Sequence, residues 1–471
     1  MHISKKTKIV ATIGPVTANE KTLTELVRSG MNVVRMNFSH GDFAEHQPKV
    51  DITRAVSKKL NTPVALLQDL SGPKFRIGDF YQERVTLVPG KRITLTPEKI
   101  VGTEERVSIN YPTLHEELKP GNVVMVDDGK KRLEVVEIKG TDVICQIVVG
   151  GETKGRRGVN LPGAYLKVSS LTEKDKKDLA FGLKNKVDFI AFSFVRRPED
   201  VIELRELLNK GKSEAKIISK IETQEAVENF DAILELSDGI MVARGDLAVE
   251  IPAEDVPMVQ KMIIKKCNRA GKPVITATQM LESMIKSPVP TRAEVSDVAN
   301  AILDGTDAVM LSEETTLGEH PVEAVRVMTR VALRVERDRS YQRRDRDFLH
   351  DNSVADAVGN AAVETSTQLG AKFIVALTDS GFTARMISRY RPNQGIICLS
   401  PNRATVNQLA LSYGCYPTLV KKFKTTAEVL SMVREFALEH KLGKKGERVV
   451  VAAGMPFGKS VDTNMMLAEV L

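Results

Sequence analysis

The sequence has few aromatic residues and no long apolar run. Aromatic side chains make up 5% of the 471 residues, so the stacking platforms on which proteins hold single-stranded nucleic acids are not expected. No apolar run approaches the length of a membrane-spanning helix, and residues 1–6 lack the apolar core of a signal peptide. These absences argue against nucleic-acid and membrane partners and predict a cytoplasmic protein.

Cysteine is also scarce. The four cysteines are scattered, and their spacing matches no metal-binding motif: they are Cys145, Cys267, Cys398 and Cys415. Reduced thiols in a cytoplasm are the simplest interpretation. The net charge of +7 is compatible with nucleic acid, with anionic small substrates or with a solvated surface. Because the basic residues are dispersed, the charge alone does not decide among the three.

The length predicts two or three domains rather than one core. Strands alternating with helices are expected at 8–14, 32–38 and 64–70, and again at 188–194, 216–222, 239–245, 273–279 and 308–313. Between them, residues 72–165 are short Val-, Ile- and Thr-rich segments separated by turns. This pattern predicts an α/β protein, a (β/α)8 TIM barrel (1–71 and 166–340) with an inserted small β-barrel lid domain (72–165).

A second α/β pattern follows the barrel. The charged stretch 338–347 is typical of a domain junction. Strands are then expected at 373–378, 395–400, 417–422 and 448–453. We therefore expect residues 341–471 to form a C-terminal α/β regulatory domain with a mostly parallel sheet.

Residues 216–246 contain the strongest chemical signal. Side chains alternate along a strand, so Lys220 and Glu222 point the same way from its end, and Asp246 follows the next strand. At the carboxyl-terminal mouth of a barrel the two carboxylates suit Mg²⁺, and the lysine suits a transferring phosphoryl group. A buried structural ion pair is the alternative interpretation of the same residues.

Other expected strands also end in polar residues, so that six of the eight carry them to one mouth. These residues are Arg35, Asn37, Ser39, Asp69, Lys220, Glu222, Asp246, Thr278, Ser312 and Glu314. The set contains no nucleophile–histidine pair. It therefore favours Mg²⁺-assisted chemistry on an anionic substrate over acyl transfer. Ser39 and Thr278 could instead cap helices, and His40 could be a plain surface residue.

Five motifs resemble the pyruvate kinase family. They are RMNFSH at 35–40, ISKIE at 218–222, MVARGDL at 241–247, TATQMLESM at 276–284 and TRAEVSDVAN at 291–300. The resemblance covers essentially the whole chain. It implies a homotetrameric glycolytic enzyme that transfers a phosphoryl group from phosphoenolpyruvate to ADP, giving pyruvate and ATP.

The resemblance also implies roles for individual residues. Glu222 and Asp246 would hold Mg²⁺, for which Mn²⁺ can substitute. Lys220 and Arg35 would contact the phosphoryl group, and the backbone N–H groups of Gly245 and Asp246 would bind the substrate carboxylate. Thr278 would belong to the proton relay. The nucleotide would contact Asn37, His40, Arg76 and Arg157.

The chain departs from the family at its monovalent-cation region. Residues 69–77 read DLSGPKFRI, where the common family form is DTKGPEIRT. Asn37, Ser39 and Asp69 are kept, but Leu70 lacks a side-chain oxygen and Lys74 reverses a charge. Since a lysine ammonium is a single compact positive charge, we expect Lys74 to replace K⁺, so that K⁺ is not required.

Two further features follow from the resemblance. Glu313 stands where glycine is usual and adds a charge near the mouth, with an unknown orientation. In the C-terminal domain, Thr378, Ser380 and Thr383 form a turn that suits phosphate, and the family position binds a phosphorylated small-molecule effector. The loop 454–459 would support it.

Two other functions fit parts of the sequence. A carbon–carbon lyase of the Mg²⁺-dependent phosphoenolpyruvate or pyruvate barrels would need neither the inserted domain nor nucleotide contacts. A basic nucleic-acid-binding or purely regulatory protein would not need Arg35, Lys220, Glu222, Asp246 and Thr278. Pyruvate kinase is therefore the expected function.

Overall fold

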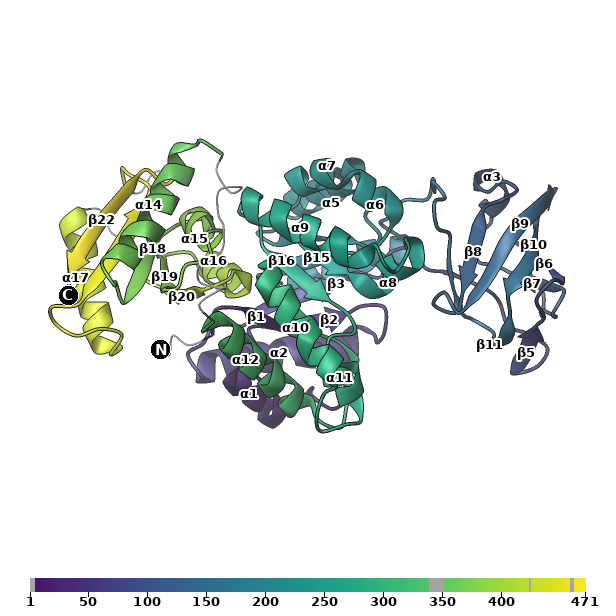
Figure 1. Ribbon diagram of the computed structural model, residues 1–471, viewed down its shortest axis with the longest axis horizontal. Helices are drawn as coiled ribbons and strands as arrows, with labels where there is room; N and C mark the ends of the chain where they lie inside the picture. The colour runs from purple at the N-terminus through teal and green to yellow at the C-terminus, as the bar shows by residue number, and fades with distance from the viewer. Residues whose placement is uncertain (1–4, 339–350, 423–424, 458–460) are drawn as a thin grey trace.

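Three parts lie along the long axis of the computed structural model, with a barrel in the middle (Figure 1). A β-rich unit inserted after the third barrel strand lies at one end, and an α/β unit built from the C-terminal part of the chain lies at the other. The structure describes residues 5–338, 351–422, 425–457 and 461–471. The exact limits of the three predicted domains stay a prediction.

Eight parallel strands close the barrel in the order β1-β17-β16-β15-β14-β13-β3-β2. This confirms the predicted (β/α)8 architecture. Apolar side chains such as Val10, Leu67 and Met241 fill its interior and are fully buried, so the barrel is a packed core with its chemistry at one mouth. The strands are β1 (Lys8–Thr12), β2 (Val33–Asn37), β3 (Ala65–Asp69), β13 (Phe189–Phe192), β14 (Lys216–Ile221), β15 (Gly239–Ala243), β16 (Val274–Ala277) and β17 (Ala308–Leu311).

Helices surround this barrel, and local signals fix several of their ends. The Asn19 side chain accepts a hydrogen bond from Thr22 N at the start of α1, and Gly30 ends that helix with φ 119°. Thr172 and Asp175 form a capping box on α4. The helices are α1 (Glu20–Ser29), α2 (Phe43–Lys59), α4 (Glu173–Lys184), α5 (Pro198–Lys210), α6 (Gln224–Glu228), α7 (Phe230–Leu236), α8 (Arg244–Glu250), α9 (Val256–Ala270), α10 (Arg292–Asp304), α11 (Glu313–Thr316) and α12 (Pro321–Glu336), with a 3-10 turn at Glu282–Ile285.

The inserted unit is a curled mixed sheet. Its seven strands run in the order β4-β12-β8-β9-β10-β6-β7, and β5 and β11 form a separate ribbon. The two sheet edges meet at the isolated bridge Ile77–Ile109, so the predicted β-barrel closes there by one bridge rather than by a continuous ladder. The elements are β4 (Phe75–Arg76), β5 (Arg84–Leu87), β6 (Arg92–Thr96), β7 (Arg106–Ser108), α3 (Leu114–Glu117), β8 (Val123–Val126), β9 (Lys131–Lys139), β10 (Asp142–Val149), β11 (Gly151–Lys154) and β12 (Gly158–Asn160).

The C-terminal unit contains the predicted parallel strands and one more. Its sheet order is β20-β19-β18-β21-β22, in which only β22 is antiparallel to its neighbour. β22 was not predicted, and most of the charged stretch taken as a junction (338–347) lies outside the described residues. The elements are α14 (Val354–Gln368), β18 (Phe373–Leu377), α15 (Phe382–Ser388), β19 (Gly395–Ser400), α16 (Arg403–Gln408), β20 (Cys415–Leu419), α17 (Thr426–Glu439), β21 (Arg448–Ala453) and β22 (Met465–Val470), with a 3-10 turn at Leu409–Leu411.

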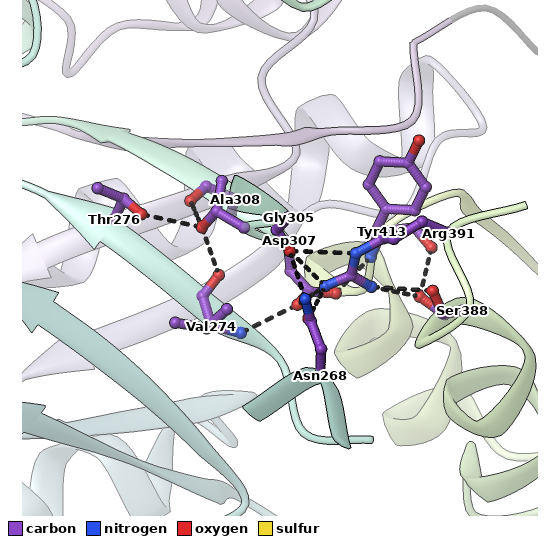
Figure 2. Close-up of polar contacts among 10 residues, drawn as sticks. Asn268, Val274, Thr276, Gly305, Asp307, Ala308, Ser388, Arg391 and Tyr413 are labelled. Carbon is purple, nitrogen blue, oxygen red and sulfur yellow. Dashed lines mark hydrogen bonds and ion pairs between the residues drawn. The ribbon is translucent and has the colours of Figure 1, made fainter. Parts of the chain in front are cut away.

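A buried arginine joins the C-terminal unit to the barrel next to the starts of two barrel strands (Figure 2). Arg391 lies between α15 and β19. Its guanidinium donates to the carbonyl of Gly305 and to Asp307 Oδ2, the latter at 2.7 Å. Asp307 directly precedes β17 and also accepts a hydrogen bond from the backbone N–H of Val274, the first residue of β16. The contact therefore fixes the starts of two barrel strands.

None of the helices within the described ranges is long and apolar enough to cross a bilayer.

Candidate active site

Four of the predicted side chains form one buried ionic cluster at the barrel mouth. Lys220 Nζ lies 2.8 Å from Glu222 Oε1 and 3.3 Å from Asp69 Oδ1. Arg35 Nε donates to the other oxygen of Asp69 at 2.6 Å. Burial opposes the charge on Lys220, but Asp69 and Glu222 outweigh it and raise the pKa of this lysine above its usual value. The ammonium therefore stays charged.

Two residues in this cluster were missed in the sequence. The Ser193 hydroxyl accepts a hydrogen bond from Lys220 Nζ at 2.7 Å and donates one to the carbonyl of Leu70. Thr12 Oγ1 accepts from Arg35 Nη1 at 2.8 Å. Both lie at ends of barrel strands, β13 and β1, for which no polar residue was predicted. That position alone could have indicated them.

Of the two carboxylates that would hold a divalent cation, Glu222 belongs to this cluster, and the charge of Asp246 acts on it. Glu222 Oε2 accepts the backbone N–H of Phe194 at 2.6 Å, whereas Oε1 is buried and forms the ion pair with Lys220 at 2.8 Å. Burial raises the pKa of Glu222, and the nearby charge of Asp246 acts in the same direction. A cation would relieve both effects.

Two carboxylates, Glu222 and Asp246, are predicted to hold this cation. In the described part of the chain, no group of three or more His, Cys, Asp or Glu side chains is placed to hold a metal ion. The pair Glu222 and Asp246 would leave most coordination positions to water and substrate oxygens. That arrangement fits Mg²⁺, which keeps several waters and binds through one or two carboxylates.

Gly245 and Thr278 are in direct contact. The Gly245 N–H donates to Thr278 Oγ1 at 2.8 Å, and this hydroxyl donates to the Ala277 carbonyl. Thr278 has φ 70°, an uncommon value for a β-branched residue, which is typical of functional sites. A substrate carboxylate at Gly245 would therefore compete with the Thr278 hydroxyl for the same N–H group.

The structure excludes helix capping for both hydroxyl residues. Helix α2 is capped by Asp42, whose side chain accepts from Glu45 N, so Ser39 is not its cap. The 3-10 turn after β16 begins at Glu282, four residues beyond Thr278. Glu314, by contrast, is structural, because its carboxylate accepts from the backbone N–H groups of Ser312 and Leu281.

The monovalent-cation region is altered as its sequence indicates. Leu70 is buried in the hydrophobic core, so its side chain offers no ligand. Asn37 Oδ1 accepts from the Ser39 N–H at 3.1 Å. The Lys74 side chain is exposed, yet the surrounding atoms partly desolvate its ammonium and lower its pKa. Lys220 acts in the same direction, while Asp246, Glu222 and Asp69 oppose it.

Three of the four predicted nucleotide residues line one cavity of about 530 Å³ between the barrel and the inserted unit. His40, Arg76 and Arg157 all face it, together with Lys74 and Asp246. Asn37 does not line it. Glu313 does, which answers the question of its orientation.

One lid contact at this cavity was not expected from the sequence. Glu250, at the end of α8, accepts a hydrogen bond from the Asn160 side chain of β12 at 3.2 Å. Burial raises the pKa of Glu250 to about 7. This carboxyl joins the barrel to the inserted unit at the edge of the site.

Two of the predicted effector residues, Thr378 and Ser380, lie in the turn between β18 and α15, and Thr383 lies in the first turn of α15. Thr378 and Thr383 are buried, and Thr383 Oγ1 accepts a hydrogen bond from Thr463 at 2.9 Å. Ser380 Oγ accepts from the Phe382 N–H at 3.4 Å. Of the supporting loop 454–459, residues 458 and 459 lie outside the described residues.

Comparison with known proteins identifies the family of this chain. The family description "Pyruvate kinase, barrel domain" matches residues 4–325, and "Pyruvate kinase, alpha/beta domain" matches residues 356–468. The chain belongs to the pyruvate kinase family. It is therefore a phosphotransferase that depends on a divalent metal ion.

Individual relatives match almost the whole of this chain. The pyruvate kinase of Clostridium acetobutylicum is 45% identical over 471 residues, which cover 99% of this chain and 100% of the relative. That of Staphylococcus epidermidis is 46% identical, covering 98% of this chain and 80% of the relative. A pyruvate kinase crystal structure from Cryptosporidium parvum superposes with a TM-score of 0.92 at 37% identity, covering 99% and 96% of the two chains.

Proposed function

We propose that this member of the family transfers the phosphoryl group of phosphoenolpyruvate to ADP, giving pyruvate and ATP in glycolysis. One observation carries the proposal: Lys220 is buried between Asp69 and Glu222 at the barrel mouth. A charged lysine held there is suited to stabilise the negative charge of a phosphoryl group in transfer. The inserted unit over the cavity distinguishes this reaction from that of a lyase barrel, which needs no nucleotide site.

The residues around Lys220 have complementary roles in this proposal. Arg35 uses Nε and Nη1 for Asp69 and Thr12, which orients the guanidinium so that Nη2 can reach the phosphoryl oxygens. Glu222 and Asp246 hold Mg²⁺ or Mn²⁺, which supplies Lewis-acid stabilisation of the substrate oxygens when bound. The N–H groups of Gly245 and Asp246 bind the substrate carboxylate.

Thr278 would then be released for proton transfer. When a substrate carboxylate takes the Gly245 N–H, the Thr278 hydroxyl loses the donor that it now accepts from. It becomes free to orient toward the methylene carbon that receives a proton. ADP would contact Asn37, His40, Arg76 and Arg157, three of which line the cavity.

K⁺ independence is the finer part of the proposal. Leu70 is buried in the core, and the Lys74 ammonium carries its charge within electrostatic range of Asp69, Glu222 and Asp246. A K⁺ ion beside this fixed charge would be repelled. Asn37, Ser39 and Asp69 remain, so the position keeps oxygen atoms for an ammonium group to approach.

One assay tests both parts. Pyruvate formation from phosphoenolpyruvate and ADP is measured with Mg²⁺ in potassium-free buffer, with and without added K⁺. Turnover that does not respond to K⁺ supports the reaction and the role of Lys74. Turnover only with K⁺ supports the reaction and contradicts that role. Absence of turnover under both conditions contradicts the proposed reaction.

The remaining features are proposed from family membership. Thr378, Ser380 and Thr383 would bind a phosphorylated small molecule, because hydroxyls and backbone N–H groups of a strand-to-helix turn suit phosphate. A screen of sugar phosphates and nucleotides, with Ser380→Ala as the comparison, would identify it. We also propose a homotetramer, checked by light scattering, and a cytoplasmic location, to which the four free cysteines are suited.

A further inference from the structure

A second histidine, His46, contacts the backbone of His40, the histidine that lines the cavity. His46, in the first turn of α2, is 1% exposed. Its Nε2 lies 3.0 Å from the backbone carbonyl of His40. A carbonyl can only accept a hydrogen bond, so this ring nitrogen must carry the hydrogen. His46 is thus a donor aimed at the turn that carries His40.

Packing fixes the ring of His46. It is stacked on Phe38, with centroids 4.0 Å apart and an interplanar angle of 13°, and meets Phe181 edge-on at 6.5 Å. Such aromatic pairs add stability beyond the area that they bury. The ring therefore cannot rotate away from the His40 carbonyl without disrupting this stack.

The surroundings also fix which nitrogen carries the hydrogen. Lys49 Nζ lies 3.4 Å from His46 Nδ1, which suits Nδ1 as the acceptor. Burial, followed by the charges of Lys49 and Lys174, lowers the pKa of His46 to about 4, while the hydrogen bond to His40 and the charge of Asp42 oppose this shift. At neutral pH the ring is uncharged, so its single hydrogen stays on Nε2.

Other contacts hold the two ends of the turn at 39–41. Before the turn, the Phe38 carbonyl accepts hydrogen bonds from Ser71 Oγ and Lys174 Nζ at 3.0 and 2.6 Å. At the end of the turn, Gly41 has φ 77°, and a Cβ added at this position would lie 2.8 Å from Glu45 Oε2. Within the described ranges, His46 is the side chain that bonds the backbone of His40.

We propose that His46 is a positioning residue for the nucleotide, acting through His40. Its Nε2–H group holds the His40 carbonyl, which sets the turn and directs the exposed His40 side chain into the cavity. The inference rests on the proposed placement of ADP in that cavity. It concerns the nucleotide alone, because the phosphoryl cluster around Lys220 is held by separate contacts.

Binding of ADP with Mg²⁺, measured by isothermal titration calorimetry, tests this without turnover. His46→Phe keeps the ring and removes the donor. We expect about 3- to 10-fold weaker ADP binding, the range for one lost hydrogen bond, and an unchanged KM for phosphoenolpyruvate. His46→Gln keeps an N–H donor and should recover part of the affinity. If Phe prevents folding, His46→Met removes the same donor with a flexible side chain.

Two comparisons separate positioning from general damage. His440 packs edge-on against Phe436 in the C-terminal unit, at 4.3 Å, so His440→Phe is a matched change that should leave ADP binding unaltered. His40→Ala combined with His46→Phe should bind ADP no more weakly than His40→Ala alone. Two results would overturn the inference if the wild type binds ADP. They are fully additive losses of ADP affinity in the double variant, and wild-type ADP affinity in His46→Phe. Failure of the wild type itself to bind ADP would refute the nucleotide placement and the inference with it.

Discussion

Arg391 and Asp307 form a buried ion pair that joins two parts of the chain far apart in sequence. Their side chains are 3% and 5% exposed, with Arg391 Nη2 at 2.7 Å from Asp307 Oδ2. Asp307 Oδ1 also accepts the backbone N–H of Tyr413. The C-terminal unit is thus attached at two points to Asp307, which directly precedes β17, at the end of the barrel where the strands begin. Figure 2 shows Arg391 and Tyr413 beside Asp307.

Removing one partner of this pair should be costly. Arg391→Met leaves Asp307 charged and buried, and we expect a loss of about 3 kcal/mol in the free energy of unfolding. Urea denaturation followed by circular dichroism measures it. Lys59→Met, which breaks the exposed pair with Glu20, is the control and should change stability by less than about 1 kcal/mol. Equal small losses of unfolding free energy in both variants would show that the Arg391–Asp307 pair does not stabilise the protein more than an exposed pair does.

Lys220→Gln should reduce kcat by at least about 10²- to 10³-fold, the range for removing one preorganised donor to transition-state charge. Lys220→Arg should not restore it, because the broad planar guanidinium does not fit the place of an ammonium between Asp69 and Glu222. Steady-state kinetics with folding checked by circular dichroism gives the answer. Ser193→Ala, which removes a hydrogen bond to Lys220, should lower kcat by about 10-fold or less; a larger fall would mean a direct role.

Restoring the family residues should create a K⁺ requirement. In Leu70→Thr combined with Lys74→Glu, a hydroxyl returns and the fixed positive charge is replaced by a negative one. We expect activity in potassium-free buffer to fall by about 10-fold or more and to recover on adding K⁺, since the site then lacks a compact cation. The K⁺ titration of both proteins, with Na⁺ as the control salt, measures this. An unresponsive variant would show that Lys74 does not replace the cation.

His46 should make stability depend on pH between 6.5 and 4. Its pKa falls from 6.5 to about 4 on folding, so the unfolded chain binds a proton in this window that the folded chain does not. The free energy of unfolding therefore decreases as the pH falls through it. We expect His46→Phe to lose less stability than the wild type between pH 7 and pH 5, by roughly 1 kcal/mol after solvent screening. Identical pH profiles, with His440→Phe as reference, would contradict the shift.

Much of the fold follows from local pattern. Each of the eight barrel strands lies within a range that the alternation of apolar runs and helices predicts, because strand and helix periodicity are properties of neighbouring residues. β22 was missed because its antiparallel pairing with β21 gives it an edge position with partly exposed residues. The curling of the inserted sheet was predicted as a small β-barrel, but its closure by one bridge between Ile77 and Ile109 required the structure.

The candidate site shows the same division. Lys220, Glu222 and Asp69 could be chosen from the sequence because strand ends of a parallel barrel meet at one mouth. Ser193 was missed because a lone serine carries no signal until its hydroxyl is seen against Lys220 Nζ. The side-chain direction of Glu313 also required the structure, because a residue at the start of a short helix can face either way.

The sequence by itself determined the order of strands and helices, the family and the chemical types at the barrel mouth. Tertiary structure decided which groups touch: Lys220 between Asp69 and Glu222, His46 beneath His40, and Arg391 on Asp307. The physical reason is the sequence distance over which each kind of interaction acts. Periodicity and capping act over a few neighbouring residues, whereas these contacts join atoms whose separation depends on barrel closure and on how the C-terminal unit packs.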